Sequence, residues 1–211
     1  MKVLSVNVGR PQLILAQGGP ISSGIIKHPV EGPVMVRRTN LDGDRQSDLS
    51  VHGGVTKAVY GYPSEYYPLW RHELANPELS FGGFGENLTT QGLFDEEVMI
   101  GDRFQVGEAV LVVTQPRMPC FKLAARITPD IGHRMIETRR HGFYFSVAQE
   151  GSVGAGDEIW LLERPESSLT VAELASIYLG HSIEPELIRR AMALESLSEK
   201  WKHKLAQRAA L

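Results

Sequence analysis

The sequence predicts a mainly β fold: a barrel of short strands with a few inserted helices, followed by a small C-terminal domain of three helices. Short β-branched and aromatic runs alternate with glycine-rich turns up to about residue 164. Beyond that point the apolar residues recur with a helical period, and Gly180 is the only glycine left. A chain of 211 residues is long enough for one sizeable core plus such an appendage.

Seven segments read as strands, and several of them alternate apolar and polar residues with a period of two. In chain order they cover residues 2–8, 34–37, 58–62, 97–100, 103–106, 109–114 and 158–162. The pairs Gly101-Asp102 and Gly156-Asp157 each precede an apolar run, which is typical of a tight turn that leads into a strand. The number and shortness of the strands favour a barrel.

Three short helices are expected to interrupt the strands and cover the barrel, at residues 64–74, 121–127 and 133–139. The first is the clearest, because Tyr67, Trp70, Arg71 and Leu74 fall on one helical face.

The change of pattern near residues 164–168 predicts a boundary between a first domain, 1–164, and a second, 165–211. Thr170 and Glu173 have the spacing of a capping box, as do Ser196 and Glu199, and Pro185 suits the first turn of a helix between them. Helices this short are unstable alone. We therefore expect them to dock on each other and on the barrel or on a second subunit, which would make a homodimer.

Composition excludes several classes of protein. The 22 basic and 25 acidic residues give a net charge of −3, without a basic stripe for a nucleic-acid duplex. No stretch has the ~18 apolar residues of a membrane span, and the N-terminus lacks a signal sequence, so a cytoplasmic protein is expected. One cysteine allows no intrachain disulfide, and the spacings suggest no self-contained zinc site.

That cysteine, Cys120, is the first candidate for chemistry. It follows Pro116 and Pro119, which stiffen the backbone, and Arg117 and Lys122 supply positive charge that favours a thiolate. A thiolate is a soft ligand for molybdenum, copper or iron, or a nucleophile. Two alternatives remain at this point: a buried inert thiol, and a cysteine hydrolase with His52, His133 or His141 as base.

Two glycine-containing segments offer polar groups. In residues 42–60, Gly53 and Gly54 expose backbone N–H groups between His52 and Lys57, a combination suited to an anion such as phosphate, although a polar turn is the alternative. In residues 81–90, glycines that allow sharp turns precede Glu86 and Asn87. The second segment lacks the spacing of a dinucleotide fingerprint.

Together, four motifs in order resemble one family: Asp42-Gly-x4-Asp48-x3-His52-Gly-Gly-x-x-Lys57-Ala-Val, Phe84-Gly-Glu-Asn-Leu-Thr-Thr-x-Gly-Leu93, Ile100-Gly-Asp-x-Phe104 and Gln115-Pro-Arg-x-Pro-Cys120-Phe-Lys-Leu123. They are similar to those of MOSC-domain proteins of the YiiM-like branch. The resemblance covers residues 1 to about 163, and the C-terminal segment is similar to the three-helix domain that this branch carries.

The resemblance implies a MOSC-type β-barrel in which Cys120 binds the molybdenum of the molybdenum cofactor. His52, Gly53, Gly54, Lys57 and Arg117, with Arg45 as a weaker candidate, would bind the phosphate of the cofactor's pterin. Asp48 and Asn87 would hydrogen-bond the pterin or a substrate, whereas Glu86 either does the same or caps a turn.

The resemblance also implies an activity, the reduction of N-hydroxylated compounds such as hydroxylaminopurine bases to amines. This reaction needs two electrons, yet the sequence has no cysteine cluster for an iron–sulfur centre and no flavin or nicotinamide fingerprint. A separate flavin or iron–sulfur reductase is therefore the expected partner. The alternative is a non-catalytic carrier of the cofactor or of sulfur, related to the C-terminal domains of cofactor sulfurases.

Overall fold

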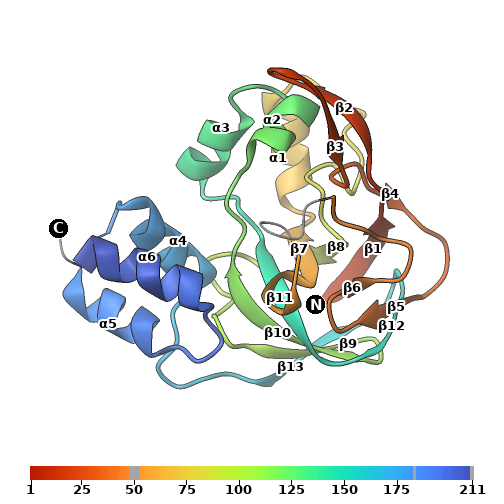
Figure 1. The fold of residues 1–211 in the computed structure, drawn as a ribbon. Helices are drawn as coiled ribbons and strands as arrows, with labels where there is room; N and C mark the ends of the chain where they lie inside the picture. Colours follow the sequence, from red (N-terminus) through yellow and green to blue (C-terminus); the bar gives the residue numbers. More distant parts are fainter. Residues whose placement is uncertain (48–52, 183, 210–211) are drawn as a thin grey trace.

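The computed structural model describes residues 1–47, 53–182 and 184–209 (Figure 1). Its strands are β1 (Lys2–Val8), β2 (Gln12–Ala16), β3 (Gly19–Ser23), β4 (His28–Pro29), β5 (Val34–Arg37), β6 (Asn40–Leu41), β7 (Val59–Pro63), β8 (Leu88–Gln91), β9 (Arg103–Val106), β10 (Ala109–Pro116), β11 (Phe143–Gln149), β12 (Gly151–Val153) and β13 (Ile159–Glu163). Its helices are a 3-10 turn η1 (Val55–Lys57), α1 (Tyr66–Glu73), α2 (Phe121–Arg126), α3 (Ile131–Thr138), α4 (Val171–Leu179), α5 (Pro185–Ala193) and α6 (Glu199–Ala209).

One large sheet forms the body, with the strand order β13-β9-β10-β11-β7-β8-β1-β4. Its pairs are antiparallel except for β7 and β8. The predicted β-rich body is confirmed. Within the described residues, however, no ladder closes the sheet into a barrel: Lys2 of β1 makes an isolated bridge with Glu158, just before β13, and Ile159 N donates to Met1 O (2.8 Å).

The C-terminal helices pack on the sheet and share its apolar core. Leu174 and Ile177 of α4, Ile188 of α5 and Leu205 of α6 belong to the same buried cluster as Leu111 of β10. In Figure 1 these helices lie beside the sheet on the side of β10. This packing confirms that the three helices dock on the body, while the domain boundary at residue 164 stays a prediction.

Most predicted helices are present within a few residues of their expected ends. The capping box at α4 is confirmed, since Glu173 N donates to Thr170 Oγ1 (3.0 Å) and Thr170 N donates to Glu173 Oε2 (2.8 Å). Pro185 opens α5. The second capping box is wrong, because α6 begins at Glu199 itself, which places this residue at the first helical position instead of the third.

The strand expected at residues 97–100 is also wrong. Met99 makes only an isolated bridge with Thr170, and the segment forms a turn instead. Met99 N donates to Asp102 Oδ2 (2.9 Å), and the buried Asp102 carboxylate pairs with Arg164 (2.6 Å). A local side-chain acceptor thus takes the N–H group that a strand would have paired.

A second buried cluster lies under α1 and is rich in aromatic rings. Tyr62 stacks on Phe84, with 4.7 Å between ring centres, and Trp70 Nε1 donates to the Tyr62 hydroxyl (2.6 Å). Leu123 of α2 belongs to this cluster, and Cys120 packs against it. The cluster thereby fixes the start of α2 relative to the glycine-rich loop around Phe84. No helix in the described ranges is long and apolar enough to cross a membrane.

Candidate functional site

Cys120 lies where β10 passes into α2. It is the residue that precedes the first turn of α2, it is half-buried, and its sulfur lies 3.7 Å from Arg117 Nη2. An open pocket is lined by Cys120, Arg117, Lys57 and Lys122, together with Tyr60 of β7 and Tyr144 of β11. Cys120 therefore lines a cavity instead of being fully enclosed in the core.

Arg117 is buried, with 5% of its surface exposed. Its backbone N–H donates to Gly142 O (3.0 Å), which fixes the residue at the end of β10, and its guanidinium lies over the Tyr60 ring at 5.6 Å. Nη1 has no hydrogen-bond partner in the described parts of the chain. A buried donor without a partner is costly, so this nitrogen points to an anionic or acceptor group of a ligand.

Two lysines add positive charge to the same pocket. Lys122 Nζ donates to Ser47 Oγ (2.8 Å) and to Ser22 O (3.4 Å). Lys57 Nζ lies 6.0 Å from the centre of the Tyr144 ring, and burial, followed by the charge of Lys200, lowers the pKa of Lys57. Burial raises the pKa of Tyr144, so this residue contributes a neutral wall. With Lys27, which also lines the pocket, one thiol is combined with four basic side chains.

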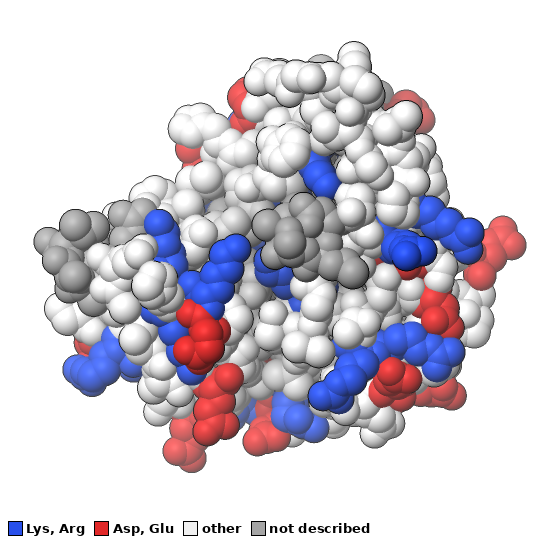
Figure 2. Space-filling view, viewed as in Figure 1, with Lys and Arg blue, Asp and Glu red and all other residues white. Residues whose placement is uncertain are grey.

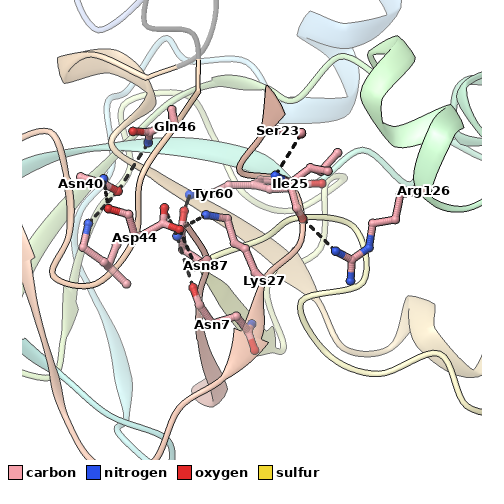
Figure 3. Close-up of polar contacts among 12 residues, drawn as sticks. Asn7, Ser23, Ile25, Lys27, Asn40, Asp44, Gln46, Tyr60, Asn87 and Arg126 are labelled. Carbon is pink, nitrogen blue, oxygen red and sulfur yellow. Dashed lines mark hydrogen bonds and ion pairs between the residues drawn. The ribbon is translucent and has the colours of Figure 1, made fainter. Parts of the chain in front are cut away.

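A second wall of the pocket is formed by Lys27 and Asn87, which are both held by Asp44 (Figure 3). Asp44 forms a buried ion pair with Lys27, accepts a hydrogen bond from Gly9 N (2.9 Å) and accepts another from Asn87 Nδ2 (3.0 Å). Burial lowers the pKa of Lys27, and the carboxylate of Asp44 opposes that shift. The polar groups of this network bind each other.

Asn87 lines the pocket, but the protein itself binds its carboxamide. Oδ1 accepts from Tyr60 N (3.1 Å), and Nδ2 donates to Asn7 O (3.3 Å) as well as to Asp44. Asn87 thus ties the pocket wall to β1 and β7. Its expected bond to a pterin stays a prediction.

Glu86 is buried and organises the glycine-rich loop. Its carboxylate accepts hydrogen bonds from Gly82 N (2.8 Å), Phe84 N (3.1 Å), Thr89 Oγ1 (2.8 Å) and the Tyr67 hydroxyl. Burial raises the pKa of Glu86, while these hydrogen bonds oppose the rise. Of the two roles considered for Glu86, capping a turn is the one that these contacts support.

The remaining predicted residues divide into three groups. Gly53 lines the pocket, with a positive φ of 96° that glycine adopts readily. Gly54 leads into η1 and Arg45 is exposed, and neither lines the pocket. Asp48 and His52 lie outside the described residues.

The hydrolase alternative needs a histidine beside Cys120. His133 is exposed and pairs with Glu137 (3.1 Å), and His141 is buried; neither lines the cysteine pocket. Burial lowers the pKa of His141 to about 4, so it is neutral at pH 7. Within the described ranges, therefore, no histidine is placed to act as a base on the thiol.

Several pocket residues were not expected from the sequence: Lys27, Ser47, Tyr60 and Tyr144. They come from segments far apart in the chain, and no local motif marks them. Tyr60 and Tyr144 are neighbours in the β7–β11 pair, so a correct strand pairing would have indicated both.

Comparisons with known proteins match two families. A MOSC domain matches residues 48–160, and a YiiM-like, 3-alpha helix domain matches residues 169–210. The uncharacterised protein YflK of Bacillus subtilis (strain 168) is 43% identical over 201 residues, which cover 95% of this chain and 90% of YflK. Protein YiiM of Escherichia coli (strain K12) is 36% identical over 189 residues, which cover 88% of this chain and 84% of YiiM.

Two further relatives bear on fold and function. The crystal structure of YiiM from Geobacillus stearothermophilus superposes with a TM-score of 0.81 at 32% identity and covers 99% of this chain and 98% of that one. A protein of Gibberella moniliformis (strain M3125 / FGSC 7600) named reductase is 38% identical over 183 residues, which cover 85% of this chain but 32% of the fungal protein. The chain belongs to the MOSC-domain family, in the branch that joins this domain to a YiiM-like 3-alpha helix domain.

Proposed function

We propose that the chain binds the molybdenum cofactor in the Cys120 pocket and uses it to reduce N-hydroxylated compounds to amines. The observation that carries the proposal is the pairing of a half-buried thiol with a buried guanidinium whose Nη1 has no partner among the described residues. Members of the MOSC family are generally associated with this cofactor, which the matched domain supports.

The donor set of the pocket fits such a group. Thiolate sulfur is a soft ligand of the kind that suits molybdenum. No cluster of three or more His, Cys, Asp or Glu side chains that could hold a metal ion is found in the described ranges. A metal at Cys120 would therefore arrive with ligands of its own, as it does in a metal–pterin. Arg117, Lys57 and Lys122 supply the cations that a phosphate on the pterin needs.

The reaction consumes two electrons and two protons: the N–O bond of R–NHOH breaks, and R–NH₂ and water form. When bound, the cofactor supplies the metal centre that takes the oxygen and exchanges the electrons. The chain holds it through Cys120, neutralises its phosphate through Arg117 and Lys57, and shields one side with the Tyr60 and Tyr144 rings.

Electrons would come from a separate reductase, because the single cysteine cannot ligate an iron–sulfur cluster. The fungal relative named reductase supports this arrangement, since the matching segment is about a third of its length and the remainder can carry other groups. This chain would take the same electrons from a second protein.

The test is turnover of 6-N-hydroxylaminopurine by protein produced in cells that make the cofactor, with a reduced viologen dye as donor. We expect the wild type to form adenine and Cys120→Ser to lose at least ~100-fold, since removing a metal ligand removes the reacting centre. Phe121→Ala is the matched control, because Phe121 neighbours the thiol but is exposed and does not line the pocket that Cys120 shares with Arg117. It should retain the rate.

Two outcomes contradict the enzyme assignment. Bound molybdenum without turnover of any N-hydroxylated base favours a non-catalytic carrier of the cofactor or of sulfur. Turnover that survives in Cys120→Ser places the reacting centre elsewhere.

A further inference from the structure

A second groove adjoins the Cys120 pocket and lies between the sheet and the C-terminal helices. The two cavities share Gly53, Lys57, Arg117 and Tyr144. From the sheet the groove is also lined by Gln115 of β10, and from the other side by Tyr178 of α4 and by one face of α6. A ligand in this groove would therefore reach the residues beside the thiol.

The α6 side of the groove is basic. Lys200, His203 and Lys204 line it with spacings of three and four residues, which places them on one helical face. No Asp or Glu is among the described residues that line the groove, although the chain as a whole carries a net charge of −3. Figure 2 shows blue side chains over α6 and in the hollow beside it. This concentration of cations favours an anion.

A buried acceptor in the groove wall lacks a partner. Gln115 is 3% exposed, and its Oε1 makes no hydrogen bond in the described parts of the chain. A ligand group that donates a hydrogen bond would satisfy this oxygen, because unpaired buried polar atoms are rare in stable folds. An anion alone would leave Gln115 unpaired.

Aromatic rings complete the groove. Tyr178 and Trp201 both line it and pack on each other, with 4.4 Å between their ring centres; because Trp201 is 5% exposed, the half-buried Tyr178 offers its ring to a ligand. Groups of this kind bind the flat face of a nucleobase. A ligand that carries an aromatic ring, an N–H donor and a negative charge satisfies all three features of the groove.

We propose that this groove binds a purine nucleoside phosphate, with its phosphate among the α6 lysines and its amino group toward Gln115. The inference rests on the proposed function and names its substrate class: N-hydroxylated purine nucleotides rather than free bases. The C-terminal helices then supply the phosphate subsite, and the MOSC domain supplies the thiol.

The test is calorimetric binding of adenosine 5′-monophosphate, adenosine and inorganic phosphate to the full chain at low salt, where surface charges are least screened. The wild type should bind the monophosphate about tenfold more tightly than adenosine or phosphate alone, since each lacks part of the ligand. Lys200→Ala and Lys204→Ala should each weaken the monophosphate about threefold and leave adenosine unchanged. Lys202→Ala is the matched control, because Lys202 is on α6 but pairs with Glu199 and does not line the groove.

Three results overturn the inference: equal affinity for adenosine and its monophosphate, an effect of Lys202→Ala as large as that of Lys200→Ala, or loss of bound molybdenum in Lys200→Ala. The last would assign the groove to the cofactor's own phosphate. Because binding is measured without turnover, a failed nucleotide preference in protein that still reduces the free base rejects only this inference. A nucleotide preference in protein without molybdenum rejects only the proposed function.

Discussion

The two walls of the Cys120 pocket are built on opposite principles. On one wall, Asp44 binds Lys27, Gly9 N and Asn87, so the polar groups there bind one another. On the other wall, the buried Arg117 places Nη2 3.7 Å from the thiol, and its Nη1 has no partner among the described residues. The first wall therefore maintains the fold, whereas the second keeps binding capacity for a ligand.

The largest effect is expected at the first wall. Asp44→Ala removes the partner of a buried lysine and should lower the free energy of unfolding by about 3–5 kcal/mol, measured by urea denaturation. Asp42→Ala is the matched control, because its ion pair with Arg37 is solvent-exposed and should contribute little to the free energy of unfolding. Equal losses in the two variants would show that the buried network does not hold the wall.

The buried carboxyl of Asp44 can be compared with a second one, Asp95, which has no ion-pair partner among the described residues. Asp95 accepts from the Tyr66 hydroxyl (3.1 Å) and from His141 N (3.3 Å), and burial raises the pKa of Asp95 to about 7. The folded state therefore keeps a proton that the unfolded state loses near pH 4. The stability that Asp95 contributes is present below pH 4 and is lost as the pH rises toward 7.

Asp95→Asn mimics the protonated group at every pH. Relative to this variant, the wild type should lose about 1.4 kcal/mol of stability per pH unit between pH 4 and pH 7. The urea midpoint of the wild type should therefore fall further below that of the variant as the pH rises. His141, whose pKa burial lowers to about 4, acts in the opposite direction but is present in both proteins. A difference that is independent of pH would contradict the burial of an uncompensated carboxyl.

The smallest effect on stability is expected at the second wall. Arg117→Met removes a cation that forms no ion pair among the described residues, so the free energy of unfolding should change by only about 1 kcal/mol, roughly its interaction with the Tyr60 ring. Bound cofactor should nevertheless fall severalfold, measured as molybdenum per protein. A loss of stability as large as that of Asp44→Ala, with the molybdenum retained, would make Arg117 structural.

The sequence predicted those elements whose secondary structure is determined by their own residues. The period-two alternation of residues 103–106 identified β9 with its bounds, and the spacing of Thr170 and Glu173 marked the start of α4. The β2–β3 hairpin was not predicted. Its Leu13 and Leu15 are apolar yet 75% and 79% exposed, so these positions do not follow the rule that apolar strand residues are buried. Strand β11 carries alternating burial that could have been found in Phe143–Gln149.

The residues of the site likewise divide into those that local sequence places together and those that only tertiary structure brings together. Arg117 and Cys120 are three residues apart, so their proximity could be predicted from the sequence, and the structure brings them together. Asp44, Lys27 and Asn87 meet only through long-range pairing, which no local pattern encodes. Lys200 and Lys204 reach the groove because α6 packs on α4 and α5 while α4 packs on β10, a tertiary arrangement that the helical period alone does not predict.

Binding of molybdenum by Cys120 is tested most directly by the molybdenum content of the purified chain and of its Cys120→Ser variant, both produced in cells that make the cofactor. We predict about one molybdenum per chain in the wild type and almost none in the variant, because hydroxyl oxygen is a poor substitute for a soft thiolate ligand. Equal molybdenum in the two proteins, or none in either, would contradict the assignment of this pocket.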